Sequence, residues 1–528
     1  MHDMEKRKQE IILSVIFLGI VVFFGLNTEL YSARIDITEN QYFSIHPVSR
    51  EILSQLPEQV TITYYFTSKL KGVNVVYRQI EDILTSYAAA SGGTIELRFV
   101  DPIRDNQTQA AREFQITQFK EDVQDSPDEA NVFLAYSGIV IQYLERYRVF
   151  PQVRSVDTLE YDLTSTIHNL LTGETPRVGI LIDKDDFNQQ QFGSVARWLQ
   201  QYFEIEPVQK GQEISAEIDT LVVIGGGSLT EADLYPIDQF IMNGGYAIFF
   251  TEGVMVNAEY GVAFPSPDVP LLSMLKAYGV TVAPALVMEN ARDSFNVQNQ
   301  PYHYWFRSYR EDANQDNPIT KRLLIANFFW ASPLSLNAPE GVTGEKLINT
   351  TPGAVKATDQ LPIQPNEVAM AYSALRAEQE SMPLAVAVSG RFPSFFRDKP
   401  VPDAEGKPKE GASPVTLSDD NRIIVVGDAD FISPRFLAYT QYANLDFFIN
   451  SLVWLSDNSN LLEIRTRSQQ NVYMSKIQNP DDRQAVIYTI IVINIFVIPL
   501  GVILFGIVKY LMRKKKQPQK PAANTPQE

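Results

Sequence analysis

Four carboxylate side chains lie toward the carboxyl ends of predicted buried strands, and this pattern points more directly to chemistry than any other in the chain. Asp183 ends the apolar run RVGILID, and Glu252 follows YAIFFT. Asp428 and Asp430 follow RIIVVG. In an open α/β sheet, ligands bind outside the carboxyl ends of the parallel strands. These side chains are therefore ligand-binding candidates, with the alternative that each one caps a helix or fixes a turn.

A glycine turn belongs to the same candidate set. Gly225, Gly226 and Gly227 follow the apolar run DTLVVI, so we expect the turn to lie beside the carboxylates. Backbone amides in such a turn can hold a phosphate group. The turn lacks both the G-x-G-x-x-G spacing and the P-loop lysine. A tight turn without a ligand is therefore the alternative interpretation.

Several kinds of catalytic site are excluded by the residues that the chain lacks. It has no cysteine, which excludes disulfides, thiolate metal sites and cysteine nucleophiles. The four histidines, at positions 2, 46, 168 and 303, show no H-E-x-x-H or paired spacing, so no zinc site is expected. No G-x-S-x-G nucleophile elbow is present. We predict no catalytic residues, no metal and no cofactor.

The first half of the chain predicts a thioredoxin-like α/β domain at residues 31–172. A strand, a helix and a second strand form a βαβ unit, and two strands with Ser137 and Gly138 as their hairpin turn follow an acidic loop at 120–131. The expected elements are strand 60–67, helix 78–91, strand 94–102, strand 131–136, strand 138–151 and helix 158–171. Redox chemistry is not expected, because the CxxC motif is missing.

The second half predicts a doubly wound α/β domain at residues 173–465, in which near-continuous apolar strands alternate with helices. Two later strands return to the same sheet, after a less regular insertion at about 285–380 that is rich in Asn, Pro and Gln. The expected strands are 177–183, 219–227, 246–253, 383–390 and 422–433. This sheet would bring the candidate residues to one edge.

Two apolar segments flank these domains. Residues 11–26 contain sixteen uncharged residues and 485–508 contain twenty-four, and spanning a bilayer takes roughly 20. Basic residues lie on the outer side of each segment, so both termini are predicted to be cytoplasmic. A cleaved signal peptide is the alternative for the first segment. The predicted order is cytoplasmic N-terminus 1–10, transmembrane helix 11–30, juxtamembrane stalk 466–484, transmembrane helix 485–510 and disordered basic cytoplasmic tail 511–528.

The charge of the chain argues against nucleic acid as a partner. The formal net charge is −18 and the pI is about 4.8, whereas phosphate-backbone binding needs clustered Lys and Arg. The hydrophobic content of 45% is ordinary for globular domains. We therefore expect folded extracytoplasmic domains and no nucleic-acid partner.

Six stretches resemble the GldG-like auxiliary proteins of ABC transporters, a family named for a component of bacterial gliding motility. They are RIDITENQYFSIHPVSREIL, YRQIEDILTSYAAASGGTIELRFVDP, YDLTSTIHNLLTGETPRVGIL, PLAVAVSGRFPSFF, RIIVVGDADFIS and NLDFFINSLVWL. The resemblance implies a membrane-anchored partner of an ABC permease and its ATPase. It also implies a central module similar to glutamine-amidotransferase-like domains, whose cysteine nucleophile this chain lacks.

The resulting expectation is a non-enzymatic auxiliary subunit in the bacterial cytoplasmic (inner) membrane, with a large periplasmic region. Its expected partners are the permease and ATPase, and its external region would engage an envelope glycan or another envelope protein. One alternative is a hydrolase of envelope glycans that uses the four carboxylates as metal ligands or as acid and base. Another is a purely structural scaffold that links the transporter to the envelope.

Overall fold

The computed structural model describes residues 44–468, except 127–128, 185–186, 258–260, 267, 359–360, 404, 409–412 and 457–458, and it also describes Thr489. The chain divides into two units, Met1–Gln469 and Gln470–Glu528. Apart from Thr489, both predicted transmembrane helices and both predicted cytoplasmic ends lie outside the described residues. Within the described part of the chain, no helix combines the length and apolar character that a membrane span requires.

A four-stranded mixed sheet forms the centre of the N-terminal lobe, which we define as residues 44–172. The strand order is β2-β1-β5-β6, with β1 parallel to β2 and antiparallel to β5, and β5 antiparallel to β6. The strands are β1 (Val60–Phe66), β2 (Ile95–Val100), β5 (Ser137–Tyr143) and β6 (Arg146–Phe150). Alternate residues of β1 and β5 pack against α4 (Val76–Ala90) and α6 (Leu159–Thr172) in one apolar core.

Two predictions for this lobe are wrong. Ser137 and Gly138 are not a hairpin turn, because both lie in β5 and pair with β1. The turn is at Leu144, where φ is 53°, so the predicted strand 138–151 is itself a hairpin. A glycine is needed at position 138 for packing, because a Cβ there would lie 2.7 Å from the Ile116 side chain. A leucine in the left-handed region carries no sequence signal for a turn.

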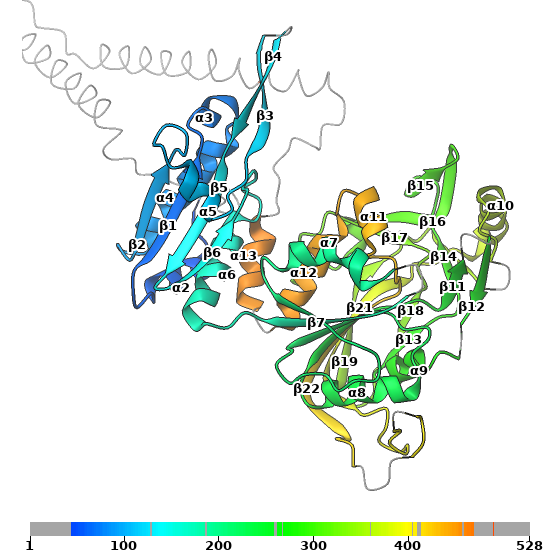
Figure 1. The fold of residues 1–528 in the computed structure, drawn as a ribbon. Coiled ribbons are helices and arrows are strands. Elements are labelled where there is room, and N and C mark those ends of the chain that lie inside the picture. The colour runs from blue at the N-terminus through cyan, green and yellow to red at the C-terminus, as the bar shows by residue number, and fades with distance from the viewer. Residues whose placement is uncertain are drawn as a thin grey trace, which may run out of the picture. The chain divides into compact units, whose positions relative to one another are not determined.

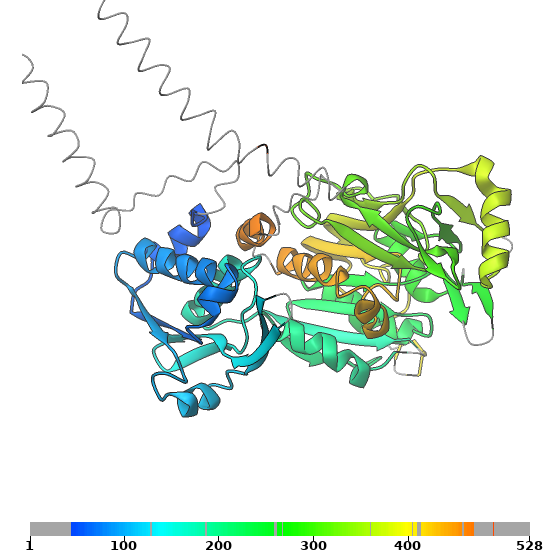
Figure 2. The ribbon, with the colours of Figure 1, turned by 90° about the horizontal axis from the view of Figure 1, so that it is seen from above.

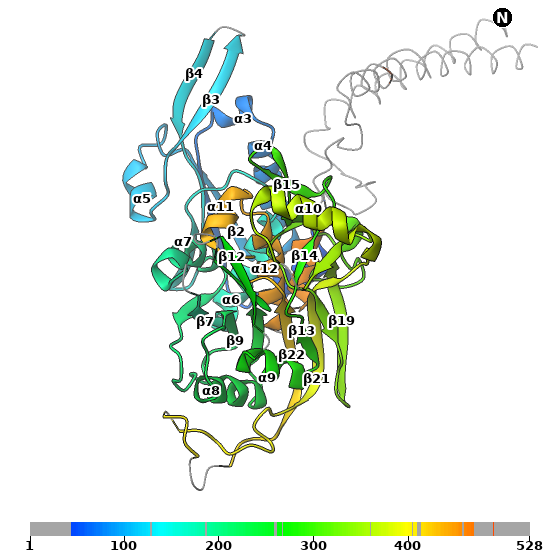
Figure 3. The same ribbon diagram turned by 90° about the vertical axis from the view of Figure 1, so that its right-hand side faces the viewer.

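The predicted acidic loop is also a hairpin. β3 (Phe119–Ser126) pairs with β4 (Glu129–Ala135) in an antiparallel ribbon. Figures 1 and 3 show this ribbon extending away from the four-stranded sheet. The strand predicted at 131–136 therefore pairs with the acidic segment and does not pair with β5.

The C-terminal lobe, residues 173–468, is built on a seven-stranded sheet with the order β19-β21-β22-β10-β9-β7-β8. The five strands from β22 to β8 are parallel, while β21 and β19 are antiparallel to their neighbours. The bounds are β7 (Arg177–Asp183), β8 (Glu204–Pro207), β9 (Thr220–Gly225), β10 (Tyr246–Phe250), β19 (Val342–Asn349), β21 (Pro383–Pro393) and β22 (Leu417–Val426). The mixed α/β class is thus confirmed, and the two late strands rejoin the sheet as predicted.

Helices cover both faces of this sheet. Residues of α7 (Gln189–Leu199) and α12 (Asn444–Leu455) share one core with Ile248 and Phe250 of β10. Residues of α8 (Glu231–Met242) and α9 (Pro270–Ala277) share the other core with Ala247 and Phe249. In Figure 1, α8 and α9 lie below the sheet, and α7 and α12 lie above it. Side chains buried on both faces explain why these strands read as continuous apolar runs.

The region predicted as an irregular insertion is more regular than its composition indicated. It supplies the edge strand β19, several small sheets and one helix. Its other elements are β14 (Leu286–Met288), β15 (Ser294–Val297), β16 (Gln300–Tyr309), β17 (Ile325–Phe329), β18 (Leu334–Leu336), β20 (Val355–Ala357) and α10 (Pro365–Leu375). The remaining elements of both lobes are α2 (Pro47–Ser54), α3 (Leu70–Val73), α5 (Thr108–Glu113), β11 (Val254–Asn257), β12 (Val262–Pro265), β13 (Val280–Val282), α11 (Pro434–Tyr439) and α13 (Ser459–Ser468).

The last described helix of the C-terminal lobe packs on the N-terminal lobe. α13 contacts α6 and α2 as well as α12, and it is the orange helix beside α6 in Figure 1 and beside the blue α2 in Figure 2. The predicted juxtamembrane stalk begins at residue 466, but the helix extends to Ser468. The two lobes are therefore joined by packing as well as by the linker at 173–176.

Replacing Phe250 with Ala tests the packing of the seven-stranded sheet. Phe250 is fully buried, with ring centroids 5.8 Å from Phe431 and 5.4 Å from Phe448. Chemical denaturation of the full-length chain should show a loss of about 3–5 kcal/mol in the free energy of unfolding. The control is Phe264→Ala, whose side chain is 57% exposed and should change the value by less than about 0.5 kcal/mol. Equal effects would contradict the described core.

Candidate functional site

The strand order places the four predicted carboxylates and the glycine turn along one edge of the sheet. β22, β10, β9 and β7 are consecutive parallel neighbours. Asp428 and Asp430 follow β22, Glu252 follows β10, and Asp183 ends β7. Their side chains have separate hydrogen-bond partners, so the edge divides into two clusters.

Asp428 is the most deeply buried member of the first cluster, with 1% of its surface exposed. Its carboxylate accepts hydrogen bonds from the backbone N–H of Phe329 at 2.7 Å and of Asp430 at 2.8 Å. Burial raises the pKa of the Asp428 carboxyl well above its ordinary value, and the nearby charges of Asp430 and Glu252 add to the effect. The bond to Asp430 closes a turn after β22, as the turn interpretation expects.

Lys184 joins the other two carboxylates of this cluster. Its Nζ lies 3.5 Å from Glu252 Oε2 and 3.5 Å from Asp430 Oδ2, and all three side chains are largely shielded from solvent. Sequence reasoning did not select Lys184, although it directly follows the carboxylate that ends β7. A cation between two shielded carboxylates reduces their repulsion, which gives this cluster a structural role.

Asp183 points to the glycine turn and forms the second cluster. Its carboxylate accepts hydrogen bonds from the N–H of Ser228 at 2.8 Å and from Ser228 Oγ at 2.6 Å, and it pairs with Lys210. Burial acts to raise the pKa of Asp183, but the hydrogen bonds from Lys210 and Ser228 outweigh it and hold the pKa below its ordinary value. This carboxylate therefore fixes the turn in its charged form.

Close packing requires the first two glycines of the turn. A Cβ at Gly225 would lie 2.1 Å from the carbonyl oxygen of Asp183, and one at Gly226 would lie 2.2 Å from the Leu271 side chain. Both have positive φ, at 82° and 94°. A Cβ at Gly227, in contrast, would have no neighbour within 4 Å. The first two glycines thus serve the fold.

The contacts at this edge give the candidate residues structural roles, and ligand binding there stays a prediction. Among the described residues, no group of three or more His, Asp and Glu side chains is arranged to hold a metal ion. The edge therefore offers no observation in favour of metal-assisted hydrolysis.

A buried arginine lies where the two lobes meet. Arg465 of α13 is 2% exposed, and its Nε donates to Asn450 Oδ1 at 2.8 Å while its Nη2 donates to Asp446 Oδ1 at 2.8 Å. The guanidinium carbon is 5.4 Å from the ring centroid of Tyr161 and 5.9 Å from that of Tyr202. Tyr161 belongs to α6 in the N-terminal lobe, so one cation contacts both lobes.

Asp162 completes this group of residues at the interface between the lobes. One carboxylate oxygen accepts a hydrogen bond from Tyr202 Oη and the other from Thr158 Oγ1, each at 2.9 Å. Desolvation raises the pKa of Asp162 to about 6, although the charge of Arg465 and the two hydrogen bonds act to lower it. The bond from Tyr202 is a second direct link between the lobes.

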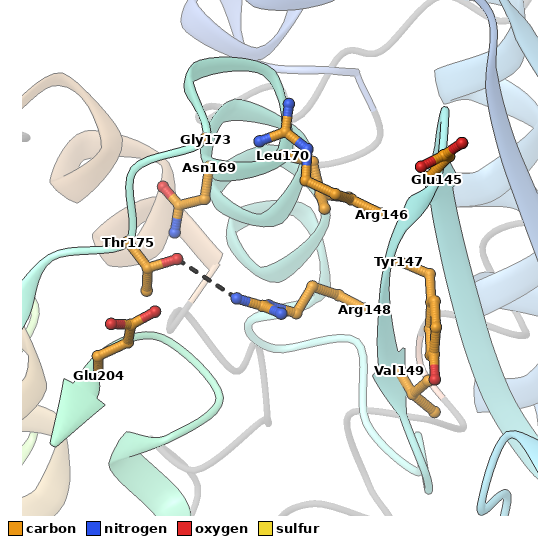
Figure 4. A pocket seen from close by; sticks show the side chains of 10 residues that line it. All are labelled: Glu145, Arg146, Tyr147, Arg148, Val149, Asn169, Leu170, Gly173, Thr175 and Glu204. Atoms are coloured by element: carbon orange, nitrogen blue, oxygen red, sulfur yellow. Dashed lines mark hydrogen bonds between the residues drawn. The ribbon is translucent and has the colours of Figure 1, made fainter.

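Two cavities that sequence reasoning missed flank the linker between the lobes. The first has a volume of about 550 Å³ and is lined by β6, the end of α6, the linker and the start of β8, as Figure 4 shows. Its lining residues are Glu145, Arg146, Tyr147, Arg148, Val149, Asn169, Leu170, Gly173, Thr175 and Glu204. The second, of about 540 Å³, shares four of these residues and is also lined by His168, Thr172, Glu174, Pro176, Arg177, Glu217, Asp219 and Ser456. Cavities of this size suit small ligands.

The sequence carried a partial signal for the first cavity. In the segment ERYRVF, Arg146 and Arg148 alternate with Tyr147 and Val149, so the two arginines share one face of a strand. The packing of the two lobes determines which element lies opposite the two arginines. The sequence alone does not predict that packing.

Comparisons with known proteins match most of the chain. A sequence model of the family described as "ABC-type uncharacterized transport system" matches residues 175–451. A model of a domain of unknown function matches residues 39–142. A protein of Borreliella burgdorferi described as uncharacterized is 20% identical over 527 residues, which cover 97% of this chain and 100% of that protein.

A solved structure of a β-galactosidase from the Antarctic haloarchaeon Halorubrum lacusprofundi also shows similarity to the chain. The sequences are 15% identical, the TM-score is 0.19, and the match covers 52% of this chain. The chain spans 44% of the length of that β-galactosidase chain.

Replacing Asp162 with Asn tests the electrostatics of the interface between the lobes. Because the folded-state pKa of about 6 lies above the ordinary value of 3.8, the folded protein retains a proton there that the unfolded chain has released. As the pH rises from about 4 to about 6, the contribution of Asp162 to the free energy of unfolding should therefore fall, on the order of 2–3 kcal/mol. Asp162→Asn should remove this decrease.

The measurement is chemical denaturation of the full-length chain at a series of pH values. The matched control is Asp268→Asn, which changes an exposed aspartate elsewhere in the same lobe as Tyr202 and should preserve the pH dependence. If Asp162→Asn showed the same decrease as the unmodified chain, the assignment of the raised pKa would be wrong.

Proposed function

Because the chain belongs to the family of ABC-type uncharacterized transport systems, we propose that it is a membrane-anchored, non-enzymatic auxiliary subunit of an ABC transporter complex. The transport-associated role follows from the family. The finer proposal is that separate permease and ATPase subunits supply the channel and the energy. It is supported by the sequence, which contains no G-x-x-x-x-G-K-[ST] motif for binding ATP.

The observation that carries this proposal is the extent of the family match. The matched residues 175–451 include all seven strands of the large sheet, the helices α7, α8 and α9, and the first two turns of α12. A doubly wound, amidotransferase-like layout for this domain is part of the proposal and is supported by its five consecutive parallel strands. A thioredoxin-like layout for the N-terminal domain is supported by the order β2-β1-β5-β6.

The proposed anchoring rests on the apolar segments 11–26 and 485–508, with basic residues on their outer sides. Both termini would be cytoplasmic, and the two lobes would lie on the periplasmic side of the cytoplasmic membrane. There they would engage an envelope glycan or another envelope protein, and a gliding-motility-type complex is one setting for this role. Nothing at the strand edge favours the alternative of a glycan hydrolase, because Lys184 and backbone amides already contact its carboxylates.

Affinity purification of the full-length chain tests the proposal. The chain carries a C-terminal tag, is solubilised in mild detergent from its native membrane, and is compared with an unrelated two-pass membrane protein that carries the same tag. We expect a permease and an ATPase to co-purify with the chain and not with the control. Recovery of the intact chain without either protein, across several detergents and after crosslinking in the membrane, would contradict the proposed complex.

A further inference from the structure

Two arginines of β6 project from one face of the N-terminal sheet into the first cavity. Arg146 and Arg148 are two residues apart on this strand, which puts their side chains on the same side. Figure 4 shows Arg146 extending from β6 toward the end of α6 and Arg148 extending toward Thr175 of the linker, while Tyr147 lies on the other side of the strand. The cavity that they enter measures about 550 Å³.

No acidic side chain among the described residues lies within ion-pair distance of either guanidinium. Glu204 lines the cavity, but its Oε2 lies 3.1 Å from Arg177 Nε and is already used by that arginine. Arg148 makes one long hydrogen bond, from Nη2 to Thr175 Oγ1 at 3.4 Å. Both arginines remain exposed to solvent, so their charges are available to a ligand.

Helix capping explains part of this arrangement. Gly173 ends α6 with φ of 76°, and a Cβ there would lie 2.6 Å from Arg146 Nη1. A cation beside the C-terminal end of a helix is favourable by about 0.3–1 kcal/mol, which accounts for Arg146. It does not account for Arg148, because that side chain reaches past the helix end to the linker.

The number of guanidinium groups indicates the chemistry of the ligand. One guanidinium satisfies both oxygens of a carboxylate in a bidentate pair. Two guanidiniums on one face instead suit a tetrahedral oxyanion, which offers more acceptor oxygens and more charge. Asn169 and Thr175 also line the cavity and add neutral hydrogen-bonding groups.

We propose that Arg146 and Arg148 form a binding site for the phosphate group of a phosphate ester, with Asn169 and Thr175 contacting the rest of the ligand. The phosphate could be the headgroup of an anionic phospholipid or belong to a soluble ester, and the two sources share this chemistry. This site would give the proposed transporter subunit a class of ligand. Phosphate binding itself does not depend on the proposed function, but its role in transport does.

Calorimetric titration of the purified full-length chain in uncharged detergent tests the site. The two probes are glycerol 3-phosphate in solution and phosphatidylglycerol added to the detergent micelles, with ionic strength held constant by sodium chloride. At least one probe should bind, and Arg146→Gln combined with Arg148→Gln should weaken that binding tenfold or more. The matched control is Arg78→Gln with Arg112→Gln, which removes two exposed arginines elsewhere and should bind as the unmodified chain does.

Each outcome decides the proposal. Binding of glycerol 3-phosphate supports a soluble ester, and binding of phosphatidylglycerol alone supports a lipid headgroup. The absence of binding by both probes at millimolar concentration would overturn the site, as would equal affinities in the two double variants. The titration contains no partner protein, so a lack of phosphate binding would not contradict the proposed transport complex. In the same way, failure to recover a permease by affinity purification would not contradict phosphate binding.

Discussion

The burial of Arg465 is the constraint on which the arrangement of the two lobes depends. An arginine keeps its charge in proteins, so a guanidinium removed from water must be surrounded by acceptors and aromatic rings. Here α12 supplies Asn450 and Asp446, the N-terminal lobe supplies Tyr161, and Tyr202 comes from the segment before β8. These groups meet around Arg465 only when α13 lies between the lobes.

Charged side chains elsewhere in the molecule fall into two kinds. Some are paired with other side chains of the fold, and others face a cavity that can hold a ligand. At the strand edge, Lys184 lies between Glu252 and Asp430, and Asp183 is held by Ser228 and Lys210. Each of these charges is balanced by neighbours in the fold. The two arginines on β6 are the opposite case, because the cavity in front of them leaves room for an anion.

Local patterns were enough to predict the α/β class, the parallel strands of the large sheet and the edge at which the candidate carboxylates lie. They failed where the determining contact is distant in sequence. Gly138 predicts a turn, yet it lies in β5 opposite Tyr65 of β1, and the Ile116 side chain occupies the space that a Cβ would need. β19 joins the sheet from a region whose composition indicates loops. The contacts of Lys184 and Arg465, and the cavities, arise from packing between segments that are distant in sequence. Hydrophobic periodicity predicts only local structure, so it could not predict them.

The most direct test of this account measures the distance between the lobes with and without the Arg465 guanidinium. The chain has no cysteine, so Ala89→Cys on α4 and Ser273→Cys on α9 provide two exposed positions for spin labels without background labelling. Pulsed electron paramagnetic resonance of the full-length chain should give one narrow distance distribution, and adding Arg465→Met should broaden it. A distribution that stays equally narrow in the Arg465→Met variant would show that the lobes do not depend on this buried cation.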